Sequence, residues 1–112
     1  MNVDGRFWLE DEGKAFVGRG RVELLEKIRD RGSINEAAKS MKMGYKAAWD
    51  AVDAINRVAS QPVAIRVKGG RSGGGTRLTP YGLALIESYR NMEREHRDFL
   101  RALSVKYAAE LS

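Results

Sequence analysis

The sequence has no cysteine and a single histidine among its 112 residues. Without cysteine it forms no disulfide, no thiolate metal site and no cysteine nucleophile. His96 has no second imidazole with which to build a histidine zinc site or a catalytic triad. We therefore expect no metal, no cofactor and no enzymatic activity; a small phosphoryl-transfer or hydrolytic protein is the alternative within the enzyme class.

Long apolar stretches are also missing. No run approaches the roughly 20 apolar residues of a membrane-spanning helix, and Met1–Gly5 lacks the basic and apolar regions of a secretion signal. A cytoplasmic protein without membrane contact is expected. With 43% hydrophobic and 31% charged residues, residues 1–112 contain enough apolar material for one packed domain.

Acidic residues are absent from a long central stretch. After Asp53 the next one is Glu87, and the basic residues between them are Arg57, Arg66, Lys68, Arg71 and Arg77. A solvated surface usually mixes both signs, so a stretch of one sign favours contact with phosphate. The formal net charge of +5 also favours an anionic partner.

An N-terminal hairpin is predicted at residues 6–18. Residues typical of strands occur in Arg6–Leu9 and in Lys14–Val17, and the intervening acidic Glu10–Gly13 ends in glycine, as turns often do.

Three helices are predicted at residues 20–60. The first ends at Gly32, since glycine tolerates the left-handed conformation of a helix end. Ser33 and Glu36 have the capping-box spacing that begins a second, short helix. The pattern breaks at Lys42–Gly44, and a third helix opens at Tyr45. A short helix, a turn and a second helix follow one another, which is the helix-turn-helix order.

The third helix is amphipathic. Ala48, Val52 and Ile55 fall at positions i, i+4 and i+7 and are expected to pack inward. The outward positions are Lys46, Asp50, Asp53 and Arg57.

A β-hairpin, or wing, is predicted at residues 63–78. Val63–Lys68 has the composition of a strand, Thr76–Leu78 provides the returning strand, and Gly69–Gly75 between them is too rich in glycine for regular structure. Interpretation of this loop as a nucleotide-binding loop is weak, because it lacks the Gly-Lys-Ser/Thr ending and the strand-to-helix junction of a phosphate loop.

A long helix is predicted at residues 79–110, with Thr79 as N-cap and Pro80 in the first turn. Apolar positions spaced four and three apart form one narrow stripe, made of Leu85, Tyr89, Met92, His96, Phe99 and Leu103. The first half of the stripe can pack on its own domain, whereas the part beyond His96 is expected to contact a second copy. His96 is better interpreted as a polar interruption of the stripe than as a ligand.

These elements predict a mainly α fold with small β-hairpins: a winged helix-turn-helix with an N-terminal hairpin and a long C-terminal dimerisation helix. The segments Gly32–Ile34, Ala37–Lys39, Tyr45–Ala51 and Leu78–Gly82, together with the glycine-rich loop, resemble the N-terminal DNA-binding domain of ModE-type molybdate-responsive regulators. The resemblance covers about Val22 to Leu100, and LysR-type regulators are similar more distantly.

The resemblance implies homodimerisation through the long helix and binding of two-fold symmetric operators on double-stranded DNA. It does not imply molybdate sensing, because nothing in the sequence corresponds to the oxyanion-binding domains; a stand-alone DNA-binding version is expected, with any small-molecule effector unknown. Two positions depart from the usual motif: Lys42 stands where the turn commonly has glycine, and Gly44 where a capping Ser or Thr is common.

In such motifs the first turns of the second helix enter the major groove. Lys46 can donate to guanine or phosphate, and Asp50 can accept from cytosine or orient Lys46. Trp49 is either a base-facing or a partly buried core residue. The full set of candidate DNA-contacting residues is Asn35, Lys39, Lys42, Tyr45, Lys46, Trp49, Asp50, Lys68, Arg71 and Arg77. The alternative function is a protein-interaction module that uses its basic wing on an acidic partner.

Overall fold

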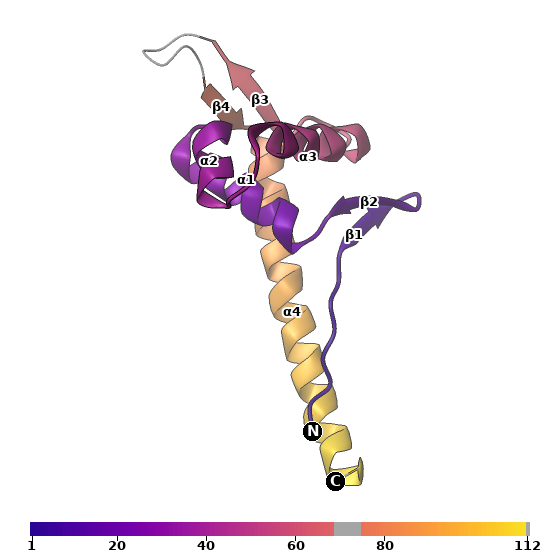
Figure 1. Cartoon of the computed structure of the whole chain (residues 1–112). Helices are drawn as coiled ribbons and strands as arrows, with labels where there is room; N and C mark the ends of the chain where they lie inside the picture. Colours follow the sequence, from indigo (N-terminus) through magenta and orange to yellow (C-terminus); the bar gives the residue numbers. More distant parts are fainter. Residues whose placement is uncertain (69–74, 112) are drawn as a thin grey trace.

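A computed structural model describes residues 1–68 and 75–111 of the chain. Along these residues the elements are β1 (Leu9–Asp11), β2 (Lys14–Val17), α1 (Arg19–Arg31), α2 (Ile34–Ser40), α3 (Tyr45–Val58), β3 (Ala64–Val67), β4 (Gly75–Leu78) and α4 (Pro80–Leu111). The predicted mainly helical fold with two small antiparallel hairpins is confirmed. Helices α1 to α3 and the β3–β4 wing form a head, from which α4 projects as a long stalk (Figure 1).

The N-terminal hairpin differs from its predicted boundaries. Its first strand is Leu9–Asp11 rather than Arg6–Leu9, and the turn consists of Glu12 and Gly13 alone. Both turn residues have positive φ, 50° and 79°, the conformation that matches the twist of a two-residue hairpin. Placing the turn at a four-residue stretch was wrong because a tight turn leaves Glu10 and Asp11 free to pair with β2.

Helix boundaries in the head follow their predicted caps. Gly32 ends α1 at φ 69°, with its N–H donating to the Ile28 carbonyl. The Ser33 hydroxyl accepts a hydrogen bond from the Glu36 N–H at 3.2 Å and so begins α2. These two residues sit next to each other, which is why α1 and α2 are separated by a sharp corner.

The core lies where α1, α3 and the first turns of α4 meet the start of the wing. Its fully buried members, each 0% exposed, include Val22, Leu25 and Ile28 of α1, Ala48, Val52 and Ile55 of α3, and Val63. The predicted inward stripe of α3 is therefore the stripe that is buried. Because that face of α3 packs inward, its opposite face is turned to solvent.

Gly82 allows α4 to cross the wing at close range. A Cβ at this position would lie 2.2 Å from the Val63 carbonyl oxygen, far inside contact distance. Thr79 caps the helix at the same place: its hydroxyl accepts from the Gly82 N–H at 3.0 Å and donates to the Pro62 carbonyl at 2.6 Å. The start of α4 is thus tied to the residues that lead into β3.

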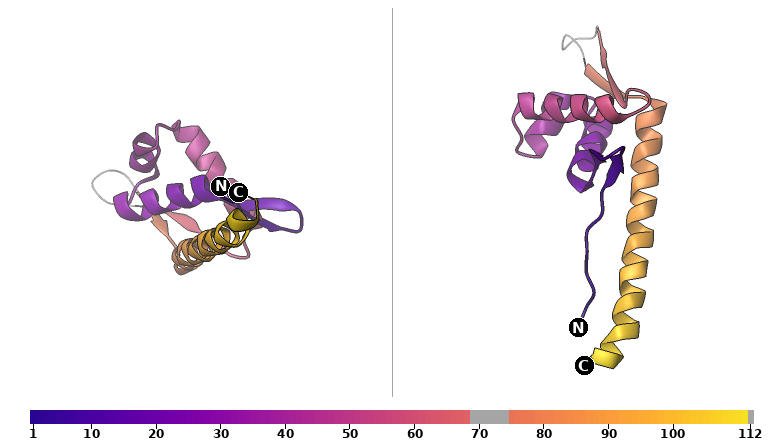
Figure 2. Two further views of the ribbon diagram at one scale, coloured as in Figure 1. Left: turned by 90° about the horizontal axis from the view of Figure 1, so that it is seen from below. Right: turned by 90° about the vertical axis from the view of Figure 1, so that its right-hand side faces the viewer.

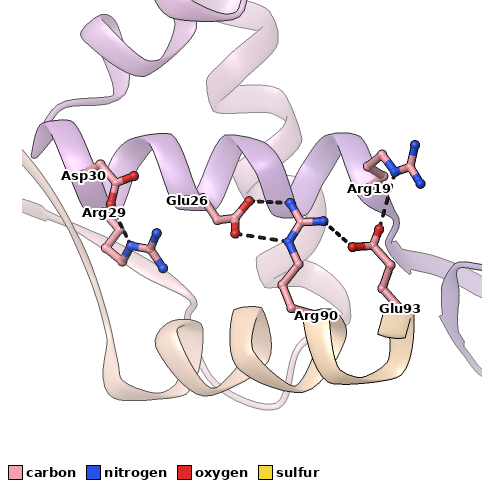
Figure 3. A network of polar contacts seen from close by, with 6 residues as sticks. All are labelled: Arg19, Glu26, Arg29, Asp30, Arg90 and Glu93. Carbon is pink, nitrogen blue, oxygen red and sulfur yellow. Dashed lines mark hydrogen bonds and ion pairs between the residues drawn. The ribbon is translucent and has the colours of Figure 1, made fainter. Parts of the chain in front are cut away.

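An ion-pair network joins α1 of the head to α4 (Figure 3). Arg90 donates to both carboxylate oxygens of Glu26, at 3.1 and 2.5 Å, and to Glu93 at 2.8 Å. Glu93 Oε2 also lies 3.4 Å from Arg19 Nε. The hydrogen bonds that Arg90 donates to Glu26 raise the pKa of Arg90, so the guanidinium keeps its charge and the link persists.

The N-terminal segment before β1 runs along the stalk (Figures 1 and 2). The Val3 N–H donates to the Ser104 hydroxyl at 2.7 Å. Phe7 stacks on Tyr89 and tilts against His96, with both ring centroids 5.0 Å away. This segment therefore covers one side of α4 beyond the head. In residues 1–68 and 75–111, no helix is both long and apolar enough to cross a bilayer.

Candidate nucleic-acid interface

The exposed face of α3 begins at its first turn. Tyr45 is 53% exposed, and Lys46 and Asp50 are exposed beside it. For Lys46 and Asp50 the direction follows from the burial of Ala48, Val52 and Ile55, which leaves residues 46 and 50 on the other side of the helix. Residue 45 lies near the edge of the buried stripe and is exposed because it begins the helix. Lys46 and Asp50 thus give the outward face of the first two turns a polar surface that is not part of the core.

Lys46 and Asp50 form an ion pair across one helical turn. Lys46 Nζ lies 2.8 Å from Asp50 Oδ2, and this hydrogen bond raises the pKa of Lys46. Of the two predicted roles of Asp50, this ion pair corresponds to orienting Lys46. An exposed pair of this kind contributes little stability, so both groups can exchange partners when a ligand supplies better ones.

The turn before α3 contains a non-glycine residue with positive φ. Lys42 adopts φ 56°, its N–H donates to the Lys39 carbonyl, and the Met43 N–H donates to the Ala38 carbonyl. These two bonds and the left-handed residue make a Schellman motif at the end of α2. The side chain of Lys42 is exposed, and Gly44 caps α3 without a side-chain hydrogen bond. The sequence departures at both positions are thus accommodated within the usual turn geometry.

Trp49 is half-buried and packs against the core, although it lies on α3 next to exposed residues. Its Nε1 is buried, and no hydrogen-bond acceptor is found for it in the described part of the chain. The guanidinium carbon of Arg66, on β3, lies 3.9 Å from the centroid of the indole ring. Of the two interpretations of Trp49, the structure favours the second and places it under the wing, at the edge of the core.

Arg66 was not among the predicted site residues. It was grouped with the other basic residues of the central stretch, whereas the strand register separates it from them. Arg66 pairs with Thr76, which is 5% exposed, and Ile65 pairs with Arg77. Residues of adjacent pairs face opposite sides of the hairpin, so Arg66, although exposed, lies on the side toward α3, and Arg77 lies on the side away from it. The sequence did not indicate this, because the apolar Ile65 and Val67 alternate with Arg66 and Lys68 and predict Ile65 inside, whereas Ile65 is 47% exposed and Ala64 is buried.

The remaining predicted contacts are exposed at the same end of the molecule. Lys68 and Arg77 lie on the wing, Asn35 and Lys39 on α2, and Lys39 Nζ is 3.8 Å from a Glu36 carboxylate oxygen. The wing, α2 and α3 gather at the end opposite the C-terminus (Figures 1 and 2). The predicted contact Arg71 lies outside the described residues.

The predicted stripe of α4 divides into two parts. Leu85 and Tyr89 are 9% and 1% exposed and belong to the chain's own core, and His96 is half-covered by Phe7. Met92 and Phe99 are 39% and 60% exposed, and Leu103 is half-buried. The exposed members of the stripe are therefore Met92 and Phe99, and Leu103 is partly exposed.

Comparison with known proteins shows extensive similarity to named regulators. The chain is 51% identical over 99 residues, 88% of its length, to the "Molybdenum transport protein ModE" of Azotobacter vinelandii. It is 46% identical over 79 residues, 70% of its length, to the "Transcriptional regulator ModE" of Haemophilus influenzae. It is also 40% identical over 89 residues, 80% of its length, to the "DNA-binding transcriptional dual regulator ModE" of Escherichia coli K12.

The resemblance to ModE-type regulators is thereby confirmed. The matched region spans only 37%, 31% and 34% of these three ModE-type relatives, so the chain corresponds to about a third of each. No family model matches the chain.

Proposed function

We propose that this chain binds double-stranded DNA sequence-specifically and regulates transcription, with two copies on an inverted-repeat operator. The observation that carries the proposal is the exposed first turns of α3, where Tyr45, Lys46 and Asp50 stand clear of the core beside a basic wing. The DNA-binding regulator named among the ModE-type relatives supports the same function.

In this proposal α3 enters the major groove, where each base pair presents a distinct pattern of donors and acceptors. The amine of Lys46 suits guanine O6 and N7, and the carboxylate of Asp50 suits the cytosine amino group. The pair they form in the free chain at 2.8 Å would be replaced by contacts to adjacent bases. Tyr45 is placed to donate its hydroxyl to a phosphate.

Phosphate neutralisation supplies the sequence-independent part of the binding energy. Lys42, Lys68 and Arg77 are exposed around α3 and on the wing. Asn35 and Lys39 are exposed on α2, and in this proposal they contact the DNA backbone beside the groove. Each neutralised phosphate releases counterions, so binding weakens as salt rises.

The second copy is inferred from the stalk. Beyond the head, α4 is covered on one side by the N-terminal segment, and Met92 and Phe99 are left exposed on the adjoining face. Apolar side chains aligned on one helix edge are removed from water when a second helix packs on them. A dimer would also supply two copies of α3, the proposed recognition helix, one for each half of an inverted repeat.

The test starts from the wild-type chain and DNA fragments selected by binding from random or genomic pools. Inverted repeats are expected among the bound fragments. On a selected site, Arg77→Ala should weaken binding to all sequences and reduce the slope of log K against log salt by roughly 0.9 for each phosphate that is no longer neutralised. Lys46→Ala should in addition reduce discrimination between the selected site and its single-base variants.

Lys14→Ala provides the matched control. Lys14 is an exposed lysine on β2, in the hairpin that points away from the wing in Figure 1, and its removal should leave affinity and salt slope close to the wild type. Failure of the wild-type chain to bind any duplex at low ionic strength would overturn the proposed function.

A further inference from the structure

Arg66 differs from the other wing cations in what it touches. It lies on the face of the hairpin that looks toward α3, opposite the nearly buried Thr76. Its guanidinium carbon is 3.9 Å from the Trp49 ring centroid, well inside the roughly 6 Å within which a cation interacts with an aromatic face. Arg66 and Arg77 are both exposed, but Arg77, one position along the paired strand, faces the other way.

Trp49 in turn belongs to α3 and lies between Lys46 and Asp50 along the recognition helix. Its side chain packs against the core, and its Nε1 finds no acceptor within residues 1–68 and 75–111. In that part of the chain, therefore, no hydrogen bond fixes the ring, and the contact across its face comes from Arg66.

We propose that Arg66 is a positioning residue that holds the wing at a set distance from the recognition helix by stacking on Trp49. The inference rests on the proposed function, since its consequence is the joint presentation of α3 and the wing to one stretch of duplex. Arg66 then acts through Trp49 and not by neutralising a phosphate. A planar guanidinium is suited to this task, because it stacks on an aromatic face in a way that a lysine ammonium does not.

The test compares two substitutions that keep the charge. In Arg66→Lys and Arg77→Lys the same chemical change is made on adjacent strands and opposite faces of one hairpin. Arg77→Lys should bind a selected duplex as the wild type does, since an ammonium also binds phosphate. Arg66→Lys should weaken binding about threefold or more per half-site while the slope of affinity against salt stays unchanged, because the net charge is the same.

Trp49→Leu checks that the effect passes through the ring. In this background Arg66→Lys should change affinity by less than about 1.5-fold, since the stacking partner is gone. Equal behaviour of the two lysine variants, or a full Arg66→Lys effect in the Trp49→Leu background, would overturn the inference while leaving the proposed function standing.

A measurement without DNA keeps the two proposals separable. The measurement uses a Trp8→Phe background, which removes the other tryptophan, 59% exposed. All indole emission then comes from Trp49. Arg66→Lys should shift this emission to longer wavelength by opening the ring face to water, whereas Arg77→Lys should leave it in place. An unshifted spectrum in Arg66→Lys would refute the stack even if no duplex were ever bound.

Discussion

At the scale of single residues, Lys42 combines an unfavourable backbone with an exposed charge. Its φ of 56° lies in the left-handed region, which costs an ordinary side chain roughly 1–2 kcal/mol, and glycine at the same place would avoid that cost. The lysine is exposed beside the first turn of α3. A cation held at this cost next to α3, the proposed recognition helix, is the pattern expected where binding, rather than stability, has use for the side chain.

Lys42→Gly should therefore separate stability from binding. The free energy of unfolding, measured by urea denaturation, should rise by about 0.5–1 kcal/mol, after allowance for the greater freedom of glycine in the unfolded chain. Affinity for a selected duplex should fall several-fold with a smaller salt slope. A variant that is stabilised and binds as well as the wild type would remove Lys42 from the interface.

Gly32→Ala makes the reverse change, adding a side chain at a left-handed position. Gly32 has φ 69°, and nothing lies within 4 Å of a Cβ placed there, so the substitution adds only the backbone cost. A loss of about 1 kcal/mol is expected. No loss would mean that left-handed positions in this chain carry no strain.

At the scale of elements, the position of the wing relative to α3 depends on how α4 packs against the head. Gly82 lets the helix pass against the Val63 carbonyl, and the Arg90 network ties its next turns to α1. Since the wing leads directly into α4, any displacement of the first turns of α4 moves the wing relative to α3.

Gly82→Ala should be severely destabilising. A methyl group 2.2 Å from a backbone oxygen requires the helix or β3 to shift, at a cost of about 3 kcal/mol, observable as a lower midpoint in thermal or urea unfolding. Gly20→Ala is the matched control, because nothing lies within 4 Å of a Cβ on Gly20 in α1. There the change should be neutral or stabilising by up to about 1 kcal/mol.

Glu93→Gln should reveal the pH dependence of the link between α1 and α4. Partial burial alone would raise the pKa of Glu93, but the hydrogen bond and charge of Arg90, with the charge of Arg19, outweigh it and lower the pKa below 4.5. A carboxylate with a lowered pKa stabilises the fold above its unfolded pKa and loses this contribution as pH falls through the folded value.

The difference in unfolding free energy between wild type and Glu93→Gln should thus be about 0.5–1 kcal/mol at pH 7. It should shrink toward zero as the pH falls from 4.5 through the lowered pKa of Glu93 in the folded chain. Denaturation series at several pH values measure it. Glu87→Gln, which removes an exposed carboxylate from the same helix, should cost less than about 0.5 kcal/mol. A difference for Glu93→Gln that grew on acidification would contradict the assigned direction of the shift.

At the scale of the whole molecule, the chain is elongated, 61 Å by 29 Å by 21 Å. The head collects the predicted DNA contacts at one end, and α4 carries exposed apolar residues away from it (Figure 1). This separation allows association of two stalks without covering α3 or the wing, which is the geometry that the proposed dimer needs.

Phe99→Glu should dissociate the proposed dimer. A charge in place of a side chain that is 60% exposed in the single chain would be buried unpaired between two helices. Light scattering should then give the mass of one chain, and affinity for an inverted repeat should fall to that for a single half-site. Leu83→Glu is the control on the same helix: Leu83 is 44% exposed, lies outside the stripe, and its substitution should leave the mass unchanged. A wild-type chain that is monomeric at all concentrations would contradict the stalk dimer.

Periodicity and capping residues were sufficient to predict the helices and the wing. The inward stripe of α3, the corner at Gly32 and Ser33 and the start of α4 at Thr79 all depend on neighbours within a few positions, which sequence displays directly. Only the first strand and the turn of the N-terminal hairpin were misplaced, because a two-residue turn at Glu12 and Gly13 has no stronger local signal than the longer acidic stretch around it.

What the sequence determined by itself was the order of elements, the exposed face of α3 and the family resemblance, since each rests on local spacing or on matched motifs. Tertiary structure alone decided that Arg66 meets Trp49, that Phe7 covers His96 and that Gly82 passes the Val63 carbonyl. The partners in each of these pairs are far apart in the sequence, and only the packing of whole elements determines which of many such pairs come within contact distance.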